Sequence, residues 1–345
     1  MKKAASIFLL ALLLFAISGL LIEIQPAKAA GTIYIRSDGS IDPPTAPISQ
    51  SGNKYTLTSS TFDSIVVEKS NIIIDGADLT LQGSGSGNGI DLSSLTGVTV
   101  MRTVIRAFEN GIYVSFSDHI TVSGNTLVEN NAGIWLSDSS YNAISKNAIT
   151  ANVYEGIYLF SSSNNVVSGN RITLTVFDGI YLYSSTDNTI YENTIRDNGY
   201  GVSAYYSSSN QIFHNNFINN TSQANPNSNA DVWDKGYPLG GNYWDDYSGV
   251  DLYSGPDQNI IGRDGIGDNG YIIDQDNRDN YPLMNPYKRG DVNYDGNVNV
   301  LDLIAVASAL GTRPGDPKWN ARADVREDGI VNVLDLIAVA GYLGT

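Results

Sequence analysis

Hydrophobic and polar residues alternate through the middle of this chain in a pattern that returns every 22 to 23 residues. Each repeat has a glycine followed by two apolar positions separated by one residue, as in Gly156, Ile157 and Leu159. The marking glycines are Gly89, Gly111, Gly133, Gly156, Gly179 and Gly201. Alternation with a period of two indicates a β-strand rather than a helix. A repeat of this length predicts stacked coils that cover each other's apolar edges.

A second strand in each coil is marked by an apolar residue with an asparagine three residues after it. These asparagines are Asn125, Asn147, Asn170, Asn193 and Asn215, and a second column, two residues before the apolar position, contains Asn142, Asn165, Asn188 and Asn210. Amides stacked about 4.8 Å apart can hydrogen-bond along a column and satisfy buried turn groups. We therefore predict an all-β parallel β-helix, right-handed like other parallel crossover connections.

The periodic pattern ends on both sides of these coils. Residues 31–88 are expected to form the first coils and the N-terminal cover, and residues 216–287, rich in Asn, Asp, Gly, Tyr and Trp, a C-terminal cap. Beyond them the string VNVLDLIAVA occurs twice, at residues 298–307 and 331–340. We therefore expect a β-helix domain over residues 31–287 and a small second domain over residues 288–345.

Each copy of this string follows a loop in which oxygen-bearing residues alternate with others. Calcium needs several oxygen ligands at about 2.3–2.6 Å, and a glycine at the sixth position of such a loop permits its sharp bend. In the second loop Arg326 stands at the third position, where a ligand is expected. We predict one firm calcium site and a second that is weak or empty. The candidate ligands are Asp291, Asn293, Asp295, Asn297, Asn299 and Asp302 in the first loop, and Asp324, Asp328, Ile330, Asn332 and Asp335 in the second.

The paired loops and following strings resemble the dockerin family, whose loop-helix repeats bind calcium and dock onto cohesin domains. The resemblance covers about residues 290–345 and implies an all-α module with a cohesin-type partner. In dockerins the partner is held by the helix that begins at the end of each loop. By that resemblance the contact residues here are Val300, Leu301, Val333 and Leu334, whose identity in both repeats would permit two binding orientations.

Two assignments of the apolar residues in these strings stay open. The four candidate contact residues would otherwise belong to the module's own core. Packing of one repeat against the other is also expected to bury Leu303, Ile304, Leu336 and Ile337.

Three strings in the predicted cap resemble the NosD-like family of secreted β-helix proteins. They are GGNYWDDYSG at residues 240–249, DGIGD at 264–268 and DNYPLM at 279–284. The resemblance covers roughly residues 31–287, and because founding members are implicated in copper supply, it raises copper delivery as a function. Copper sites favour His, Met and Cys, whereas this chain has two histidines, His119 and His214, and no cysteine. Copper delivery is therefore the least favoured function.

A stripe of aromatic residues follows the same strand of successive coils. If the isoleucines point inward, these rings point outward, where flat rings can cover the C–H faces of sugars. The alternative is that they are good strand formers covered by a loop. The stripe contains Tyr113, Trp135, Tyr158 and Tyr181, with Phe160 and Tyr183 two positions further on. We predict a carbohydrate-binding surface.

Glu155 and Asp178 precede the glycines of two adjacent coils. Carboxylates stacked one strand spacing apart repel, so they must be screened, share a proton or bind a cation. A carboxylate pair is also the minimum apparatus of glycoside hydrolysis. Solvated turn residues are the simpler interpretation, and the chain lacks the histidine and aspartate motifs of β-helix polygalacturonases. A polysaccharide hydrolase or lyase therefore stays the alternative to a binding protein.

The first 30 residues have the composition of a secretory signal: Lys2 and Lys3, an apolar run, and Ala27-Lys28-Ala29. If this segment were retained, it would anchor the protein to a membrane. The formal net charge of −16 excludes a nucleic-acid partner, because phosphate would be repelled. We expect a secreted or cell-surface protein that binds carbohydrate or another surface without catalysis and is held by its C-terminal module to a cohesin-bearing partner.

Overall fold

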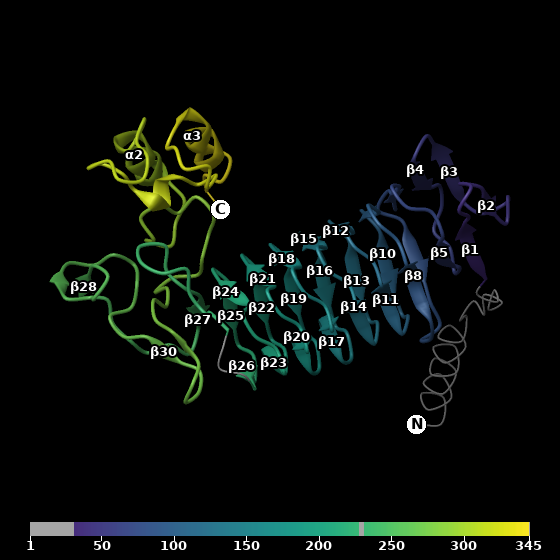
Figure 1. The fold of residues 1–345 in the computed structure, drawn as a ribbon, viewed down its shortest axis with the longest axis horizontal. Helices are drawn as coiled ribbons and strands as arrows, with labels where there is room; N and C mark the ends of the chain where they lie inside the picture. Colours follow the sequence, from purple (N-terminus) through teal and green to yellow (C-terminus); the bar gives the residue numbers. More distant parts are fainter. Residues whose placement is uncertain (1–30, 228–230, 345) are drawn as a thin grey trace, which may run out of the picture.

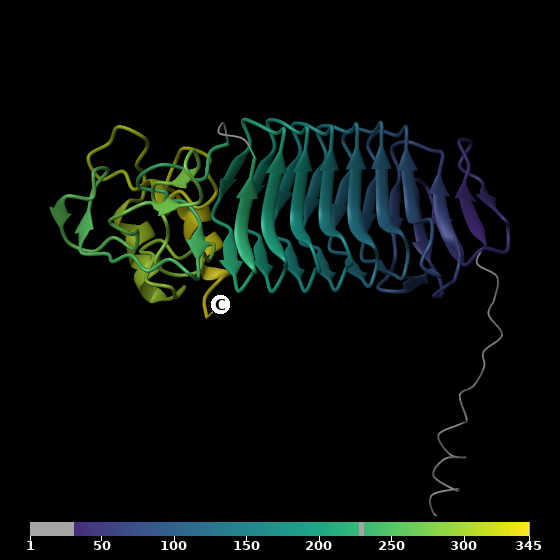
Figure 2. The same ribbon diagram turned by 90° about the horizontal axis from the view of Figure 1, so that it is seen from below.

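The computed structural model describes residues 31–227 and 231–344 (Figures 1 and 2). The chain winds into a parallel solenoid whose coils stack along the long axis of the molecule, followed by a cap and a small helical module. The predicted parallel β-helix with a helical C-terminal part is confirmed, while its right-handed sense stays a prediction. The expected signal peptide, residues 1–30, lies outside the described residues. Within the described part, no helix is long and apolar enough to cross a membrane.

Each central coil contributes one strand to each of three sheets. The first sheet contains β2 (Ile41–Asp42), β1 (Thr32–Ile35), β5 (Ser64–Val67), β8 (Asn88–Ser93), β11 (Asn110–Ser115), β14 (Ala132–Ser137), β17 (Glu155–Phe160), β20 (Asp178–Tyr183), β23 (Tyr200–Tyr205) and β26 (Ser222–Pro226). The second contains β3 (Ile48–Ser51), β4 (Lys54–Leu57), β6 (Ile73–Asp75), β9 (Thr99–Met101), β12 (Thr121–Ser123), β15 (Ala143–Ser145), β18 (Val166–Ser168), β21 (Thr189–Tyr191) and β24 (Gln211–Phe213). The third contains β7 (Thr80–Gln82), β10 (Val104–Arg106), β13 (Thr126–Val128), β16 (Ala148–Thr150), β19 (Arg171–Thr173), β22 (Thr194–Arg196), β25 (Asn216–Ile218) and β27 (Tyr243–Trp244). The third sheet was not predicted from the sequence, because each of its strands is short and most bury a single central side chain.

The solenoid interior is a stack of aliphatic side chains in register from coil to coil. Ile134 pairs with Ile157, which pairs with Ile180, and all three are fully buried. The regular recurrence of the glycines has a steric cause: a Cβ on Gly156 would lie 2.6 Å from the carbonyl oxygen of Gly179 and 2.6 Å from Ile172. Only glycine therefore fits where the first strand begins against the third sheet.

Columns of buried asparagines close the turns between sheets. The Oδ1 atom of Asn170 accepts hydrogen bonds from the backbone and side-chain nitrogens of Asn147, both at 3.0 Å, and its Nδ2 donates to Ile144 O at 2.9 Å. The two predicted columns are confirmed. A third column, missed in the sequence because Thr175 interrupts it, contains Asn130, Asn152, Asn198 and Asn220.

A cap organised around the fully buried Asp279 covers the last coil. Its carboxylate accepts hydrogen bonds from Asn242 N, Trp244 Nε1 and Tyr281 N. Trp244 stacks at 4.3 Å on Phe217, the core side chain of that coil. This arrangement joins two of the strings noted in the sequence, residues 240–249 and 279–284. The cap also contains the short strands β28 (Tyr253–Ser254), β29 (Ile260–Ile261), β30 (Tyr271–Ile272) and β31 (Arg278–Asp279).

The C-terminal module contains α2 (Val300–Ser308), the short 3-10 helix η1 (Ala321–Ala323) and α3 (Val333–Ala340), and it lies against the cap (Figure 1). Its core contains Val306 and Val339, one from each helix. Leu303 and Leu336 are partly buried, as expected. The expected burial of Ile304 and Ile337 is wrong, because both side chains are exposed. Each short helix turns only one stripe of side chains to the core, and Ile304 and Ile337 lie one turn after Val300 and Val333, on the opposite face.

Replacing Asn170 with alanine should destabilise the solenoid strongly. The change leaves the buried N–H of Asn147 and the carbonyl of Ile144 without partners, and each such group costs about 1–3 kcal/mol. We expect a loss of about 3 kcal/mol in the free energy of unfolding, measured by urea denaturation. Gln211→Ala, which removes an exposed amide from β24, is the control and should change stability by less than about 0.5 kcal/mol. An equal effect of both variants would contradict the role of the column.

Candidate functional site

The two candidate catalytic carboxylates begin adjacent strands of the first sheet. Glu155 opens β17, Asp178 opens β20, and the two residues are direct partners in the strand register. Burial, with repulsion by Asp178, raises the pKa of Glu155 to about 7. Burial also raises the pKa of Asp178, although the hydroxyl of Ser203 donates a hydrogen bond to it. The predicted stacking is therefore present, and near neutral pH Glu155 is protonated in part of the molecules.

The aromatic stripe forms a ladder on the outer face of the first sheet. Ring centroids lie 5.8 Å apart for Tyr113 and Trp135, 5.2 Å for Trp135 and Tyr158, and 5.0 Å for Tyr158 and Tyr181. A parallel column stacks Phe160 on Tyr183 at 5.6 Å. All six rings are half-buried. The outward orientation predicted from the alternation is therefore confirmed, while sugar binding stays a prediction.

Glu155 and the stripe meet at a pocket of about 260 Å³ at the start of β17. Asp178 is not part of its wall. Only Glu155, Trp135 and Tyr158 of the lining residues were predicted as site residues from the sequence. The lining residues are Glu109, Asn110, Asn131, Ala132, Trp135, Tyr154, Glu155 and Tyr158.

The pocket wall arises from a change in the period of the repeat. The turn between the third and first sheets has three residues, 129–131, in one coil and four residues, 151–154, in the next. The extra residue brings the half-exposed Tyr154 beside Glu155, and the same lengthening in the following coil brings Phe177 to stack on Tyr154 at 5.9 Å. The 23-residue spacings between Gly133, Gly156 and Gly179 were the sequence signal that could have located this site.

The position of Asp178 limits what the carboxylate pair can do. Hydrolysis of a glycosidic bond by two carboxyl groups needs both to flank the same bond. Here Glu155 opens into the pocket, while Asp178 lies one strand away, outside the pocket wall, and is held by Ser203. The arrangement can bind a sugar ring through aromatic walls and a carboxyl group, but it does not place a second carboxylate opposite the first.

The first candidate calcium loop has the donor set that calcium requires. Asp291 and Asp302 are buried, and backbone N–H groups orient their carboxylates: Gly296 N donates to Asp291 at 2.8 Å and Asn299 N to Asp302 at 2.8 Å. Burial, opposed by the hydrogen bond from Gly296 and reinforced by repulsion from Asp302, raises the pKa of Asp291 to about 6. Among the described residues, no three His, Asp or Glu side chains form a metal-binding group by themselves. Asparagine and carbonyl oxygens would have to complete the set, as the sequence predicts.

The second loop has the same frame but a cation among its ligands. Gly329 N donates to Asp324 at 2.8 Å and Asn332 N to Asp335 at 2.8 Å, as at the equivalent positions of the first loop. Arg326, however, approaches Asp328 at 3.2 Å. The guanidinium thus forms an ion pair with one of the remaining candidate ligands, and the weak or empty second site stays a prediction.

The four candidate partner contacts are exposed on the surface of the module. Between 46% and 62% of the surface of Val300, Leu301, Val333 and Leu334 is accessible. The alternative, that they form the module's own core, is wrong, because that core is formed by other positions of the same helices. Ile304 and Ile337 extend the two exposed faces.

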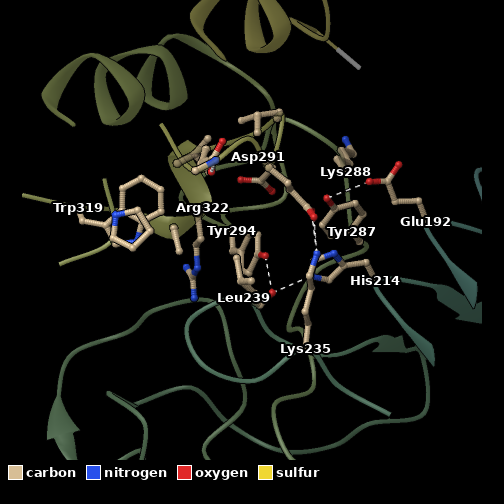
Figure 3. A pocket seen from close by; sticks show the side chains of 18 residues that line it. Glu192, His214, Lys235, Leu239, Tyr287, Lys288, Asp291, Tyr294, Trp319 and Arg322 are labelled. Carbon is tan, nitrogen blue, oxygen red and sulfur yellow. Dashed lines mark hydrogen bonds and ion pairs between the residues drawn. The ribbon is translucent and has the colours of Figure 1, made fainter. Parts of the chain in front are cut away.

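The module is fixed to the cap around a cavity of about 250 Å³, shown in Figure 3. The fourth residues of the two loops, Tyr294 and Glu327, both have positive φ and both contact the cap. The hydroxyl of Tyr294 donates to Leu239 O at 2.6 Å, and Glu327 pairs with Lys235 at 2.8 Å. Because the loops face the cap, both helices keep their apolar faces free.

The histidines do not form a copper site. His214 is buried, stacks on Tyr287 at 4.1 Å and has its Nε2 atom 2.7 Å from Leu239 O (Figure 3). Burial lowers its pKa to about 4, so it is neutral at physiological pH. His119 is exposed beside Asp118, four coils away, which at about 4.8 Å per coil is roughly 19 Å. The two rings cannot ligate one ion.

Comparisons with known proteins agree with both parts of the chain. The family model described as periplasmic copper-binding protein (NosD) matches residues 45–249, and that of the dockerin type I domain matches residues 289–344. A search of curated proteins found no match.

Solved structures match about half of the chain at low identity. A double mutant of the periplasmic alginate epimerase AlgG is 22% identical over 49% of this chain and 45% of that chain, with a TM-score of 0.46. A mutant of DFA-IIIase from Arthrobacter chlorophenolicus A6, in complex with DFA-III, is 18% identical over 49% and 40%, with a TM-score of 0.35. An alginate lyase from Paenibacillus sp. str. FPU-7 is 15% identical over 52% and 90%, with a TM-score of 0.27. The chain thus spans less than half of the AlgG structure, and these similarities concern the fold alone.

Replacing Glu155 with glutamine should change how stability depends on pH. The pKa of Glu155 rises from 4.5 to about 7 on folding, so its contribution to stability is full below pH 4.5 and is lost as the pH rises through 7. The neutral variant avoids this loss and should be more stable than the wild type at pH 8 by about 1–2 kcal/mol, after allowance for solvent screening. Urea denaturation at pH 5 and pH 8 measures the difference. Asp138→Asn, which removes an exposed carboxyl group outside the pocket, is the charge-matched control. Parallel pH profiles for wild type and Glu155→Gln would contradict the assignment.

Calcium titration of the intact protein should resolve unequal sites. Isothermal titration calorimetry is expected to show one tight site, with any second site at least about tenfold weaker, because Arg326 places a charge where a ligand belongs. Arg326→Asp should create a second tight site, and Asp295→Ala should remove the first. Two sites of equal affinity in the unaltered chain would show that Arg326 does not matter.

Proposed function

The chain belongs to the NosD family of β-helix proteins and ends in a dockerin type I domain, and from this premise we propose that it is a secreted, non-enzymatic carbohydrate-binding protein held to a cohesin-bearing partner. The dockerin domain attaches the protein to the cohesin-bearing partner, and this binding depends on calcium. The solenoid is a rigid support that displays the aromatic stripe. Secretion agrees with the periplasmic and extracellular settings of these two families.

The exposed apolar faces of α2 and α3 carry the proposal. On each helix a valine, a leucine and an isoleucine face solvent although a folded core lies beneath them. Apolar patches of this kind on a small domain are typical of protein interaction sites. The two faces have the same sequence, and neither is used to hold the module on the cap.

Calcium would act on docking through the starts of the helices. Asp302 is a candidate ligand and also the third residue of α2, where it completes the capping box by accepting a hydrogen bond from Asn299 N. Asp335 is likewise a candidate ligand and the acidic residue of the capping box that begins α3. Because Val300 and Leu301 belong to the first turn, an ion held by Asp302 would order the residues that contact the partner.

Carbohydrate binding is supported by the convergence of the stripe and the pocket. Trp135, Tyr158 and Tyr154 wall a cavity whose polar groups can bond hydroxyls. A polysaccharide hydrolase or lyase is the second candidate, favoured by the raised pKa of Glu155, which suits a general acid. The binding function is preferred because Asp178 does not share the pocket. Copper delivery is not supported by the separated histidines.

Docking should require calcium and at least one intact helix face. We expect the chain to bind type I cohesin domains with calcium and to lose that binding in EDTA, as measured by calorimetry against a panel of recombinant cohesins. Leu301→Ala or Leu334→Ala alone should weaken binding only a few-fold, because the other helix offers the same face. The double variant should bind at least about 100-fold more weakly, which is about 2.7 kcal/mol.

Leu252→Ala is the matched control, because Leu252 is an equally exposed leucine on the cap. It should leave cohesin binding unchanged. Calcium-independent binding, or full binding by the double variant, would contradict the proposed attachment.

A further inference from the structure

We propose that the solenoid cap is coupled to the first calcium site and that Tyr294 is the positioning residue that joins them. Tyr294 is not a candidate ligand, but it lies between two of them, Asn293 and Asp295, and its side chain is buried in the cap. Calcium binding and seating of the module on the cap are then one coupled equilibrium. This inference rests on the predicted calcium site and goes beyond calcium-dependent attachment to a partner.

The side chain of Tyr294 belongs to the core of the cap rather than to that of its own module. It packs in one cluster with the buried cap residues Ile266 and Leu283, whereas the core of the module is a separate cluster. Its hydroxyl donates to Leu239 O at 2.6 Å, and only 9% of its surface is exposed (Figure 3). The cap therefore holds this residue through both its ring and its hydroxyl.

The backbone of Tyr294 is held as closely as its side chain. Asn285 Nδ2 donates to Tyr294 O at 3.1 Å, and a Cβ on Gly265 would lie 2.4 Å from the Cβ of Tyr294. The φ angle of Tyr294 is +58°, a value that bulky residues rarely adopt. Glu327, the fourth residue of the second loop, has a φ of +55°, so both loops share this turn. Contact with the cap thus stabilises the backbone conformation between two candidate calcium ligands.

Arg322 joins the module to the same part of the cap. Its Nε atom donates to Pro238 O at 2.6 Å and its Nη1 atom to Asp264 O at 2.8 Å. The guanidinium carbon lies 4.0 Å from the centre of the Tyr294 ring. Asp264 and Gly265 begin the string DGIGD, which therefore contacts both the first calcium loop and η1.

The second loop contacts the cap through a weaker interaction. Glu327 pairs with Lys235 at 2.8 Å, but 63% of the Glu327 side chain is exposed. Solvent screens such an ion pair, and exposed pairs contribute little to stability. The coupling therefore acts mainly on the first loop, where the firm calcium site is predicted.

Coupling of this kind is reciprocal. If the seated module binds calcium more tightly than a displaced one, calcium favours the seated position by the same free energy. Couplings between two sites typically change affinity about 5- to 150-fold. By this route calcium fixes the orientation of the solenoid relative to the module, and hence relative to the partner that the module binds.

Calcium titration of the intact chain by calorimetry tests the coupling. Tyr294→Ala and Arg322→Ala should each raise the Kd of the tight site about tenfold, which is about 1.4 kcal/mol, although neither removes a candidate ligand. The direction for Arg322→Ala is decisive, because loss of a positive charge near a cation site would by Coulomb's law alone lower the Kd. Arg313→Ala, which removes an exposed arginine from the same module, is the charge-matched control and should not raise the Kd. Circular dichroism verifies that each variant is folded.

Hydrogen exchange measures the reciprocal effect on the cap and needs no substitution. In the unaltered chain calcium should slow exchange in residues 264–267 and 281–284, where Gly267 N donates to Pro282 O and Met284 N to Gly265 O. Tyr294→Ala should abolish this calcium-dependent protection. Strand β17, in the middle of the solenoid, is the internal reference and should exchange equally with and without calcium.

The outcomes separate this inference from the attachment that it extends. An unchanged Kd in folded Tyr294→Ala, a Kd lowered by Arg322→Ala, or exchange in the cap that does not respond to calcium would each overturn the coupling. Each of these results would leave the calcium site and the attachment to cohesin intact. If the unaltered chain binds no calcium, the predicted site, the calcium dependence of the attachment and this inference are all wrong.

Discussion

The hydrogen-bonded register between successive coils is the constraint on which the structure depends. Backbone ladders hold each strand one spacing from its neighbours, and the asparagine columns repeat that register in the turns, where Asn147, Asn170 and Asn193 form a continuous chain of buried amides. Because side chains alternate between faces, a shift of one residue would turn the aliphatic stack outward and the aromatic stripe inward. The register therefore determines both the core and the surface.

The same register explains why unusual chemistry collects on the first sheet. Stacking places each residue directly above its equivalent, so Tyr158 lies on Tyr181 and Glu155 on Asp178. For aromatic rings this proximity is favourable. For carboxyl groups it is costly, and part of that cost appears as the raised pKa of Glu155. In two coils the turn before the first sheet is one residue longer. The added residue places Tyr154 beside the aromatic ladder, where it forms one wall of the pocket.

The C-terminal module is fixed to the cap on one side and exposes its proposed binding surface on the other. Its two repeats use equivalent loop positions, Tyr294 and Glu327, to contact the cap, so the helices that begin after each loop face away. Arg322 reinforces the contact by donating to Pro238 O at 2.6 Å and Asp264 O at 2.8 Å while lying over the ring of Tyr294. An ion bound near the cap would thus act on helix starts that are free to meet a partner.

The sequence alone determined the coil period, the inward and outward faces of the first strand, two of the three asparagine columns and the calcium-loop pattern, because each is a local or strictly periodic property. It did not reveal the third sheet, whose strands such as Ile149 and its two neighbours are too short to show alternation. Nor could it show that Ile304 stays exposed, that His214 is enclosed by Tyr287, or that Glu155 shares a pocket with Tyr154 and Glu109 and not with Asp178. Those facts depend on how turns of unequal length pack together and on how the C-terminal module packs against the cap. Both involve contacts between residues far apart in the chain, so only the tertiary structure decides them.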